Sequence, residues 1–205
     1  FEECISKKLD NCPFPDFKGI EIKVKGQFSK QKINLICIEP DFLFSTYNLA
    51  KDYGYKPKDK DKKFFYLEVC TTKKNRYIKH YFQLQVDDKN EKINLLIFNS
   101  GGKLVNNNVS WSFQDMIGRV YIKLHTLAFI TYYKKIIDNE DYYLYNRLQY
   151  YKNINFDKFI QAIKDGVISI KFTININTVT DKIKNHGTAF AIDKKDLSKI
   201  YDNSY

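Results

Sequence analysis

Hydrophobic positions recur along this chain at two spacings, which together predict a mixture of strands and helices. Alternation with a period of two is clearest in residues 20–25 and 167–176, and it is typical of strands with one apolar face. Other runs rich in β-branched and aromatic residues predict strands at 33–38, 64–72, 76–86, 93–99, 127–133, 142–151 and 186–192. Apolar spacings of three and four predict helices at 1–9, 47–53, 111–124, 156–165 and 194–201.

Capping and turn residues support parts of this assignment. Asn155 can cap the helix at 156–165, Gly166 can end it, and residues 87–90 read as a hairpin turn. Residues 99–110, with two glycines and three successive asparagines, are predicted to form a polar loop. Strands and helices mix without a repeating unit, which predicts an α/β (α+β) fold with a mixed central β-sheet flanked by helices.

Composition narrows the class of protein. The chain has 205 residues, enough for one substantial core, and a formal net charge of +10 that favours a polyanionic partner. Lysine greatly outnumbers arginine, and asparagine, isoleucine and tyrosine are abundant; this bias is typical of an AT-rich genome and weakens the charge argument. No apolar run reaches the roughly 18–20 residues that cross a bilayer, so no membrane association is expected.

The four cysteines lack the spacing of a zinc site. Cys4, Cys12, Cys37 and Cys70 form no CxxC pair and have no paired histidines nearby, so we expect reduced thiols in a cytoplasmic protein. The sequence begins with Phe1 rather than methionine, and we therefore expect that it lacks the natural start of the chain.

Residues 13–25 carry the chemistry that the rest of the chain is expected to support. Asp16 follows Pro15, and the strand after Gly19 places Glu21 and Lys23 on one face, because side chains alternate along a strand. Two carboxylates beside an ammonium can hold a hard divalent cation and its bound water. The alternative interpretation is an amphipathic edge strand whose charged face is solvated.

The spacing of these residues resembles the PD-(D/E)XK nuclease signature, and further segments resemble the MvaI/BcnI restriction endonucleases, relatives of the mismatch-repair nickase MutH. The segments occur in the order of that family and span almost the whole chain. They are Pro15–Lys23, Tyr53-Gly54-Tyr55, the run Val-Ser-Trp-Ser-Phe at 109–113 with the helix after it, His186-Gly187-Thr188-Ala189-Phe190, and Lys195-Asp196-Leu197.

The resemblance implies a PD-(D/E)XK restriction-endonuclease-like fold, two-lobed and monomeric like MutH. Residues 1–205 would form a single endonuclease domain, with the signature in 13–25 and a DNA-recognition lobe toward 99–205. The implied activity is that of a type II site-specific endonuclease that cleaves double-stranded DNA with Mg²⁺, nicking each strand in turn. A cognate DNA methyltransferase would be its partner in a restriction–modification system.

The resemblance also implies roles for individual residues. Asp16, Glu21 and the main-chain carbonyl of Ile22 would hold Mg²⁺. Lys23 would orient the attacking water, help deprotonate it, or stabilise the charge that develops on the phosphate. Glu2 matches the acidic residue on the N-terminal helix of the family and would order metal-bound waters, although the helix dipole alone can account for an acid in that first turn.

Residues that contact DNA are less strongly indicated. His186 is the leading base reader, with a structural role as the alternative, because Ala191 stands where the family commonly has an arginine. The further candidates are Lys25, Arg119, Lys184 and Asn185, and the loop 99–110 is either a solvent-exposed connection or a DNA-contacting loop. His80 and His125 are expected to be ordinary strand residues, with a phosphate contact as the alternative for His80, which follows Lys79 on a basic strand.

Two rival functions share most of these features. One is a MutH-like repair nickase, which uses the same chemistry under different control. The other is a non-catalytic DNA-binding module that kept the fold. The intact set of Asp16, Glu21 and Lys23 argues against the module, because two carboxylates facing a phosphate backbone would repel it.

Overall fold

The computed structural model describes residues 14–41 and 46–205, and these fold into two compact units. Unit 1 contains the described residues up to Ile33 together with Ile117–Phe159 and Asp193–Tyr205, and unit 2 contains Asn34–Met116 and Ile160–Ile192. Both units are therefore assembled from separated stretches of sequence, and residues 99–205 contribute to both. No helix in the described ranges is long and apolar enough to span a membrane.

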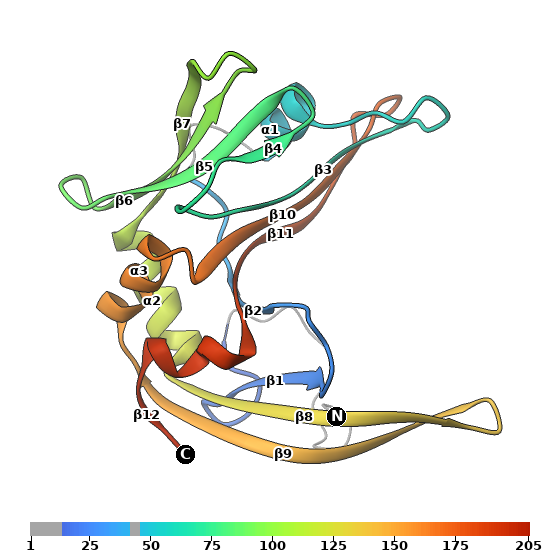
Figure 1. The fold of residues 1–205 in the computed structure, drawn as a ribbon, viewed down its shortest axis with the longest axis vertical. Coiled ribbons are helices and arrows are strands. Elements are labelled where there is room, and N and C mark those ends of the chain that lie inside the picture. The colour runs from blue at the N-terminus through green and yellow to red at the C-terminus, as the bar shows by residue number, and fades with distance from the viewer. Residues whose placement is uncertain (1–13, 42–45) are drawn as a thin grey trace. The chain divides into compact units, whose positions relative to one another are not determined.

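Unit 1 is built on a mixed four-stranded sheet that contains the signature strand. The sheet has the order β1-β8-β9-β12, with β1 parallel to β8 and the remaining pairs antiparallel (Figure 1). Its strands are β1 (Glu21–Gly26), β8 (Thr126–Ile137), β9 (Glu140–Ile154) and β12 (Tyr201–Ser204). Within the described residues, β1 therefore lies at one edge of this sheet, next to β8.

Unit 2 contains two further four-stranded sheets, in the orders β2-β11-β10-β3 and β4-β5-β6-β7. Aromatic rings fill the space between them: the Phe65 ring lies 5.6 Å from that of Phe82, and the Trp111 ring lies 6.2 Å from that of Phe172. The strands are β2 (Ile33–Cys37), β3 (Lys62–Val69), β4 (Asn75–Tyr77), β5 (His80–Asp87), β6 (Lys92–Phe98), β7 (Leu104–Ser112), β10 (Ile168–Asn177) and β11 (Ile183–Ile192).

The helices of the described residues are α1 (Thr46–Tyr53), α2 (Phe113–Leu124), α3 (Phe156–Lys164) and the 3₁₀ helix η2 (Lys194–Ile200). Two of them, α1 and α3, match the predicted ranges closely. Asn155 caps α3 by accepting a 3.0 Å hydrogen bond from the Lys158 amide, and Gly166 follows the helix with a φ of +70°. The predicted mixed α/β class is confirmed, as is the apolar face of β10, where Ile168, Ile170, Phe172, Ile174 and Ile176 are buried.

The prediction of a polar loop at 99–110 is wrong for most of that range. A tight turn does form at Asn99–Lys103, where the Gly102 amide donates to the Asn99 carbonyl at 3.0 Å. The three asparagines then belong to β7, which pairs with β6 through an irregular register. Cross-strand pairing with an apolar, buried neighbour has overridden the low strand propensity of asparagine.

Three smaller differences from the predicted elements arise where a turn or the pairing of a strand depends on residues that are distant in the sequence. The run at 76–86 is two strands, β4 and β5, separated by a turn in which Ile78 has a φ of +55°. The helix expected at 194–201 is a 3₁₀ helix that ends at Ile200, and Tyr201 begins β12. Trp111 and Ser112 end β7, so that α2 starts at Phe113.

Candidate active site

A tight turn places Asp16 beside the signature strand. Phe17 and Ile20 exchange two backbone hydrogen bonds of 3.0 and 2.8 Å, and the two residues between them, Lys18 and Gly19, have φ values of +47° and +80°. Positive φ at both central positions is the type I′ geometry that joins antiparallel neighbours. The four residues between Asp16 and Glu21 are therefore the length needed to fold the chain back on itself.

The Asp16 carboxylate is fixed against β1 by the backbone. Its Oδ2 accepts a 2.9 Å hydrogen bond from the Ile22 amide, on the peptide directly after Glu21. The two acids are close enough that the charge of Asp16 raises the pKa of Glu21. Asp16 and Glu21 thus lie close together, held by one turn.

Glu21 is buried, and its side chain is 1% exposed. Burial is the largest cause that raises the pKa of the Glu21 carboxyl, while Lys23 and Lys123 lower it. The Lys23 ammonium lies 2.5 Å from one carboxylate oxygen, and the Lys123 ammonium lies 3.6 Å from the other. The alternative of a solvated charged face on this strand is therefore wrong for Glu21.

Lys123 is a member of the site that sequence reasoning missed. It lies in the last turn of α2, far along the chain from the signature, and its side chain is 22% exposed. A basic residue in the last turn of a helix is common, because it interacts favourably with the helix dipole. No local pattern therefore distinguishes Lys123 from an ordinary capping lysine.

Tyr201, at the start of β12, also lies near Glu21. Burial, with the charge of Glu21 adding to it, raises the pKa of the Tyr201 phenol, so this side chain stays neutral. Its hydroxyl is buried and has no hydrogen-bond partner among the described residues. Tyr201 is thus a buried, neutral neighbour of the Glu21 carboxylate.

The residues present fit a hard divalent cation. Both Glu21 oxygens are buried, and within the described part of the chain their close polar neighbours are the ammonium groups of Lys23 and Lys123. Mg²⁺ prefers one or two carboxylates and keeps several waters, so Asp16, Glu21 and one main-chain carbonyl make an adequate set of protein ligands. Among residues 14–41 and 46–205 no group of three or more acidic, histidine or cysteine side chains could hold a metal ion, so a bound cation would need water and main-chain oxygen to complete its ligands.

The other predicted site residues are divided between the two units. Lys25 on β1 and an exposed Arg119 on α2 belong to unit 1 with the carboxylates. Lys184, Asn185 and His186 lie together on β11 of unit 2, and all three are exposed. Glu2, predicted to order metal-bound waters, lies outside the described residues.

A β-bulge turns His186 out of the regular strand. Thr188 pairs with Phe172 and Asn185 pairs with Ile174, so His186 and Gly187 together oppose a single residue of β10. Such bulges re-aim a side chain and are frequent near functional sites. Gly187 has a φ of +90°, and a Cβ there would lie 3.2 Å from the Cys37 side chain, which explains the glycine.

Asn185 is engaged within the protein. Its amide nitrogen donates to Thr46 Oγ1 at 3.2 Å, and its amide oxygen accepts from the Gly187 amide at 2.9 Å. Both ends of the side chain therefore support the bulge that presents His186. This favours His186 and Lys184 over Asn185 as the residues that contact a ligand.

The fold is that of a restriction endonuclease. The structure is similar to a complex of restriction endonuclease MvaI with its cognate DNA substrate, with 24% sequence identity and a TM-score of 0.89 over 100% of this chain and 84% of that one. It is also similar to MvaI in the absence of DNA, with 24% identity and a TM-score of 0.71 over 93% of this chain and 79% of that one. No curated protein matches the sequence.

The amino-acid sequence matches one protein family along almost its whole length. Residues 1–201 match the MvaI/BcnI restriction endonuclease family, and the chain belongs to this family. The resemblance stated from sequence motifs is thereby confirmed over the whole chain, and the protein is by class a site-specific DNA endonuclease.

Proposed function

We propose that this protein is a type II endonuclease that hydrolyses phosphodiester bonds at a specific site in double-stranded DNA, with Mg²⁺ as its cofactor. The observation that carries the proposal is the buried Glu21 carboxylate, which lies close to Asp16 and is paired with the Lys23 ammonium on the same strand. A fold that only bound DNA would gain nothing from the cost of burying this charge.

Each residue of the signature has a distinct part in the proposed reaction. Asp16, Glu21 and the Ile22 carbonyl would hold Mg²⁺, which when bound polarises the scissile phosphate and lowers the pKa of a bound water. Lys23 is held in an ion pair with Glu21, so its ammonium would be a fixed positive charge next to the attacked phosphate. That geometry favours charge stabilisation and water orientation over service as a strong base. Glu2 would order the waters around the cation.

Recognition would be shared among basic and polar groups. His186, presented by its bulge, and the neighbouring Lys184 are proposed to contact base edges, with Asn185 holding the bulge in place. Lys25 and Arg119 are proposed to contact phosphates, because they lie in the same unit as the carboxylates. The protein would act as a monomer in the cytoplasm, nick the two strands in turn, and be paired with a methyltransferase that protects host DNA.

The test is cleavage of supercoiled, unmethylated plasmid with Mg²⁺ or with EDTA, followed by sequencing of the ends. We expect discrete ends with Mg²⁺ and an open-circle intermediate, and we expect Lys23→Ala to abolish cleavage while retaining duplex binding. Lys152→Ala is the matched control, because it removes a lysine of the same sheet from the opposite face. Products that stop at the open circle would indicate a strand-nicking repair enzyme, and binding without cleavage of any DNA would indicate a binding module.

A further inference from the structure

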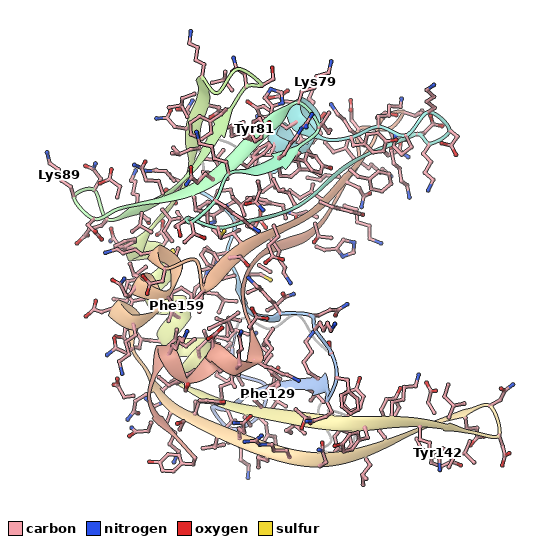
Figure 2. The ribbon with its side chains drawn as sticks, in the orientation of Figure 1. Lys79, Tyr81, Lys89, Phe129, Tyr142 and Phe159 are labelled. Carbon is pink, nitrogen blue, oxygen red and sulfur yellow. The ribbon has the colours of Figure 1, made fainter. Side chains whose placement is uncertain are left out.

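Unit 1 contains a cavity of about 420 Å³ that the proposed reaction does not use. It lies between the sheet and η2, with Phe129, labelled in Figure 2, among the residues that line it. Its polar lining includes Arg147, Lys194, Lys195, Thr131, Gln149 and Ser198. We call this cavity the basic pocket.

The chemistry of the basic pocket suits an oxyanion. Three cationic side chains line it, and no acidic side chain is among its lining residues. Lys194 is held in place by donating a 2.6 Å hydrogen bond to the Gln27 carbonyl. Arg147 and Lys195 form no salt bridge with any residue in the described ranges, so their charges are available to a ligand. Hydroxyl and amide groups beside these charges can donate hydrogen bonds to the oxygens of a phosphate.

Strand register places the basic pocket on the same face of the sheet as the proposed catalytic lysine. Residues that lie directly opposite each other on neighbouring strands project from the same face. Two rows cross the sheet in this way. They are Lys23–Phe129–Gln149 and Lys25–Thr131–Arg147.

The separation between the two features matches the repeat of a DNA strand. Neighbouring strands lie about 4.8 Å apart, so residues on β8 and β9 are about 5 and 10 Å from Lys23 across the sheet. A DNA strand carries one phosphate for about every 3.4 Å along the helix axis, and successive phosphates are farther apart than this in space because the strand also winds around the axis. A phosphate in the basic pocket would therefore be about one or two nucleotides from a phosphate at Lys23.

We propose that the basic pocket binds a backbone phosphate of the DNA substrate, displaced by about one or two nucleotides from the cleaved bond. Arg147 and Lys195 supply the charge. Lys194 is held by its hydrogen bond to Gln27, the residue after β1, and forms part of the pocket lining. This inference rests on the proposed endonuclease function, since it assigns a second contact to the same substrate strand. Its consequence is that the pocket fixes the register of the strand over Lys23.

The first test measures binding of a short DNA duplex in EDTA by fluorescence anisotropy across a range of KCl concentrations. Arg147→Gln and Lys195→Gln should each weaken binding about fivefold to tenfold near 0.1 M salt and reduce the slope of log K against log salt by about 0.9. Lys152→Gln is the matched control, because Lys152 is on β9 like Arg147 but projects from the opposite face. Equal effects of Arg147→Gln and Lys152→Gln, or no effect of either, would overturn the proposal.

The second test locates the phosphate. Once the cut site is known from plasmid cleavage, single methylphosphonates are placed at successive positions of the cleaved strand. One substitution near the cut site should weaken binding of the wild-type protein and cause no further loss in Arg147→Gln. If every substitution weakens the variant as much as the wild type, no backbone phosphate occupies the pocket.

A third measurement separates DNA from a free anion. Pyrophosphate is added to the wild type and to Arg147→Gln in a thermal unfolding experiment without DNA. Stabilisation of the wild type but not of Arg147→Gln, together with an unchanged DNA salt slope, would show a site for a free anion and overturn the DNA assignment. Failure of the endonuclease proposal itself would be seen separately, as a wild-type protein that leaves plasmid intact.

Discussion

Asp16 is joined to Ile22 by a 2.9 Å hydrogen bond, which ties the first acid of the signature to the strand that carries the second. The bond depends on the turn between them, because the Asp16 carboxylate must return to the backbone six residues later. The geometry of the proposed catalytic acids is thus determined by a local backbone conformation as well as by packing. The signature is compact in sequence because both acids belong to one hairpin.

Gly19 is the residue on which this turn depends most. Its φ is +80° and nothing lies within 4 Å of a Cβ built on it, so the cost of Gly19→Ala comes from the backbone alone. We expect a loss of about 1 kcal/mol in the free energy of unfolding and a larger fractional loss of cleavage, because Asp16 is displaced. Denaturant unfolding and plasmid cleavage measure the two effects.

Gly118→Ala is the control for that experiment. Gly118 also has open space around a built Cβ, but it lies within α2 and has no positive φ. The substitution should stabilise the protein by up to about 1 kcal/mol, because alanine favours a helix over glycine. If both substitutions changed stability in the same direction, the backbone explanation for Gly19 would fail.

The sequence predicted those features that depend on residues close together along the chain. The faces of β1, the cap of α3 at Asn155 and the alternation of β10 are set by local periodicity and capping, and all are present. Lys123 joins the site only through the packing of α2 near β1, and β7 exists because β6 is beside it. Such tertiary partners leave no local signal in a single sequence.

Lys123 is expected to support catalysis through the charge of Glu21. Lys123→Ala removes a positive charge that lowers the pKa of Glu21, so that pKa should rise further. The acid limb of the pH–rate profile should therefore move to higher pH, and cleavage at neutral pH should fall about tenfold to a hundredfold. Lys123→Arg keeps the charge and should restore most of the activity; a profile that does not move in Lys123→Ala would show that the residue acts in another way.

Burial of Glu21 makes the metal-free protein less stable as pH rises. The folded-state pKa of Glu21 lies above its unfolded value, so the folded state binds more protons and loses relative stability from about pH 4.5 upward, until the carboxyl is fully ionised. In EDTA, Glu21→Gln should therefore melt at the same temperature as the wild type in acid and above it at pH 8, by about 2–4 °C for each kcal/mol. Thermal unfolding across pH measures this difference.

Added Mg²⁺ should reverse the order of the melting temperatures of the wild type and Glu21→Gln at pH 8. A cation that binds the folded protein through Glu21 stabilises it by mass action, and Glu21→Gln has lost a ligand. At pH 8 the wild type should gain melting temperature with added Mg²⁺, while the variant gains little. A variant that responds to Mg²⁺ as strongly as the wild type would remove Glu21 from the proposed ligand set.

His186 and Gly187 should separate recognition from folding. His186 is exposed on the bulge of β11, so His186→Ala should leave the free energy of unfolding within about 0.5 kcal/mol of the wild type. If His186 reads a base, the variant should cleave related sites at rates closer to the rate at the cognate site. The discrimination between the two kinds of site should fall by about 1–3 kcal/mol.

Gly187→Ala should instead destabilise the protein by about 1–3 kcal/mol, because of its φ of +90° and the 3.2 Å approach to Cys37. Comparing cleavage of a library of single-base variants with denaturant unfolding gives both quantities, and unchanged site preference in His186→Ala would leave the histidine a structural residue.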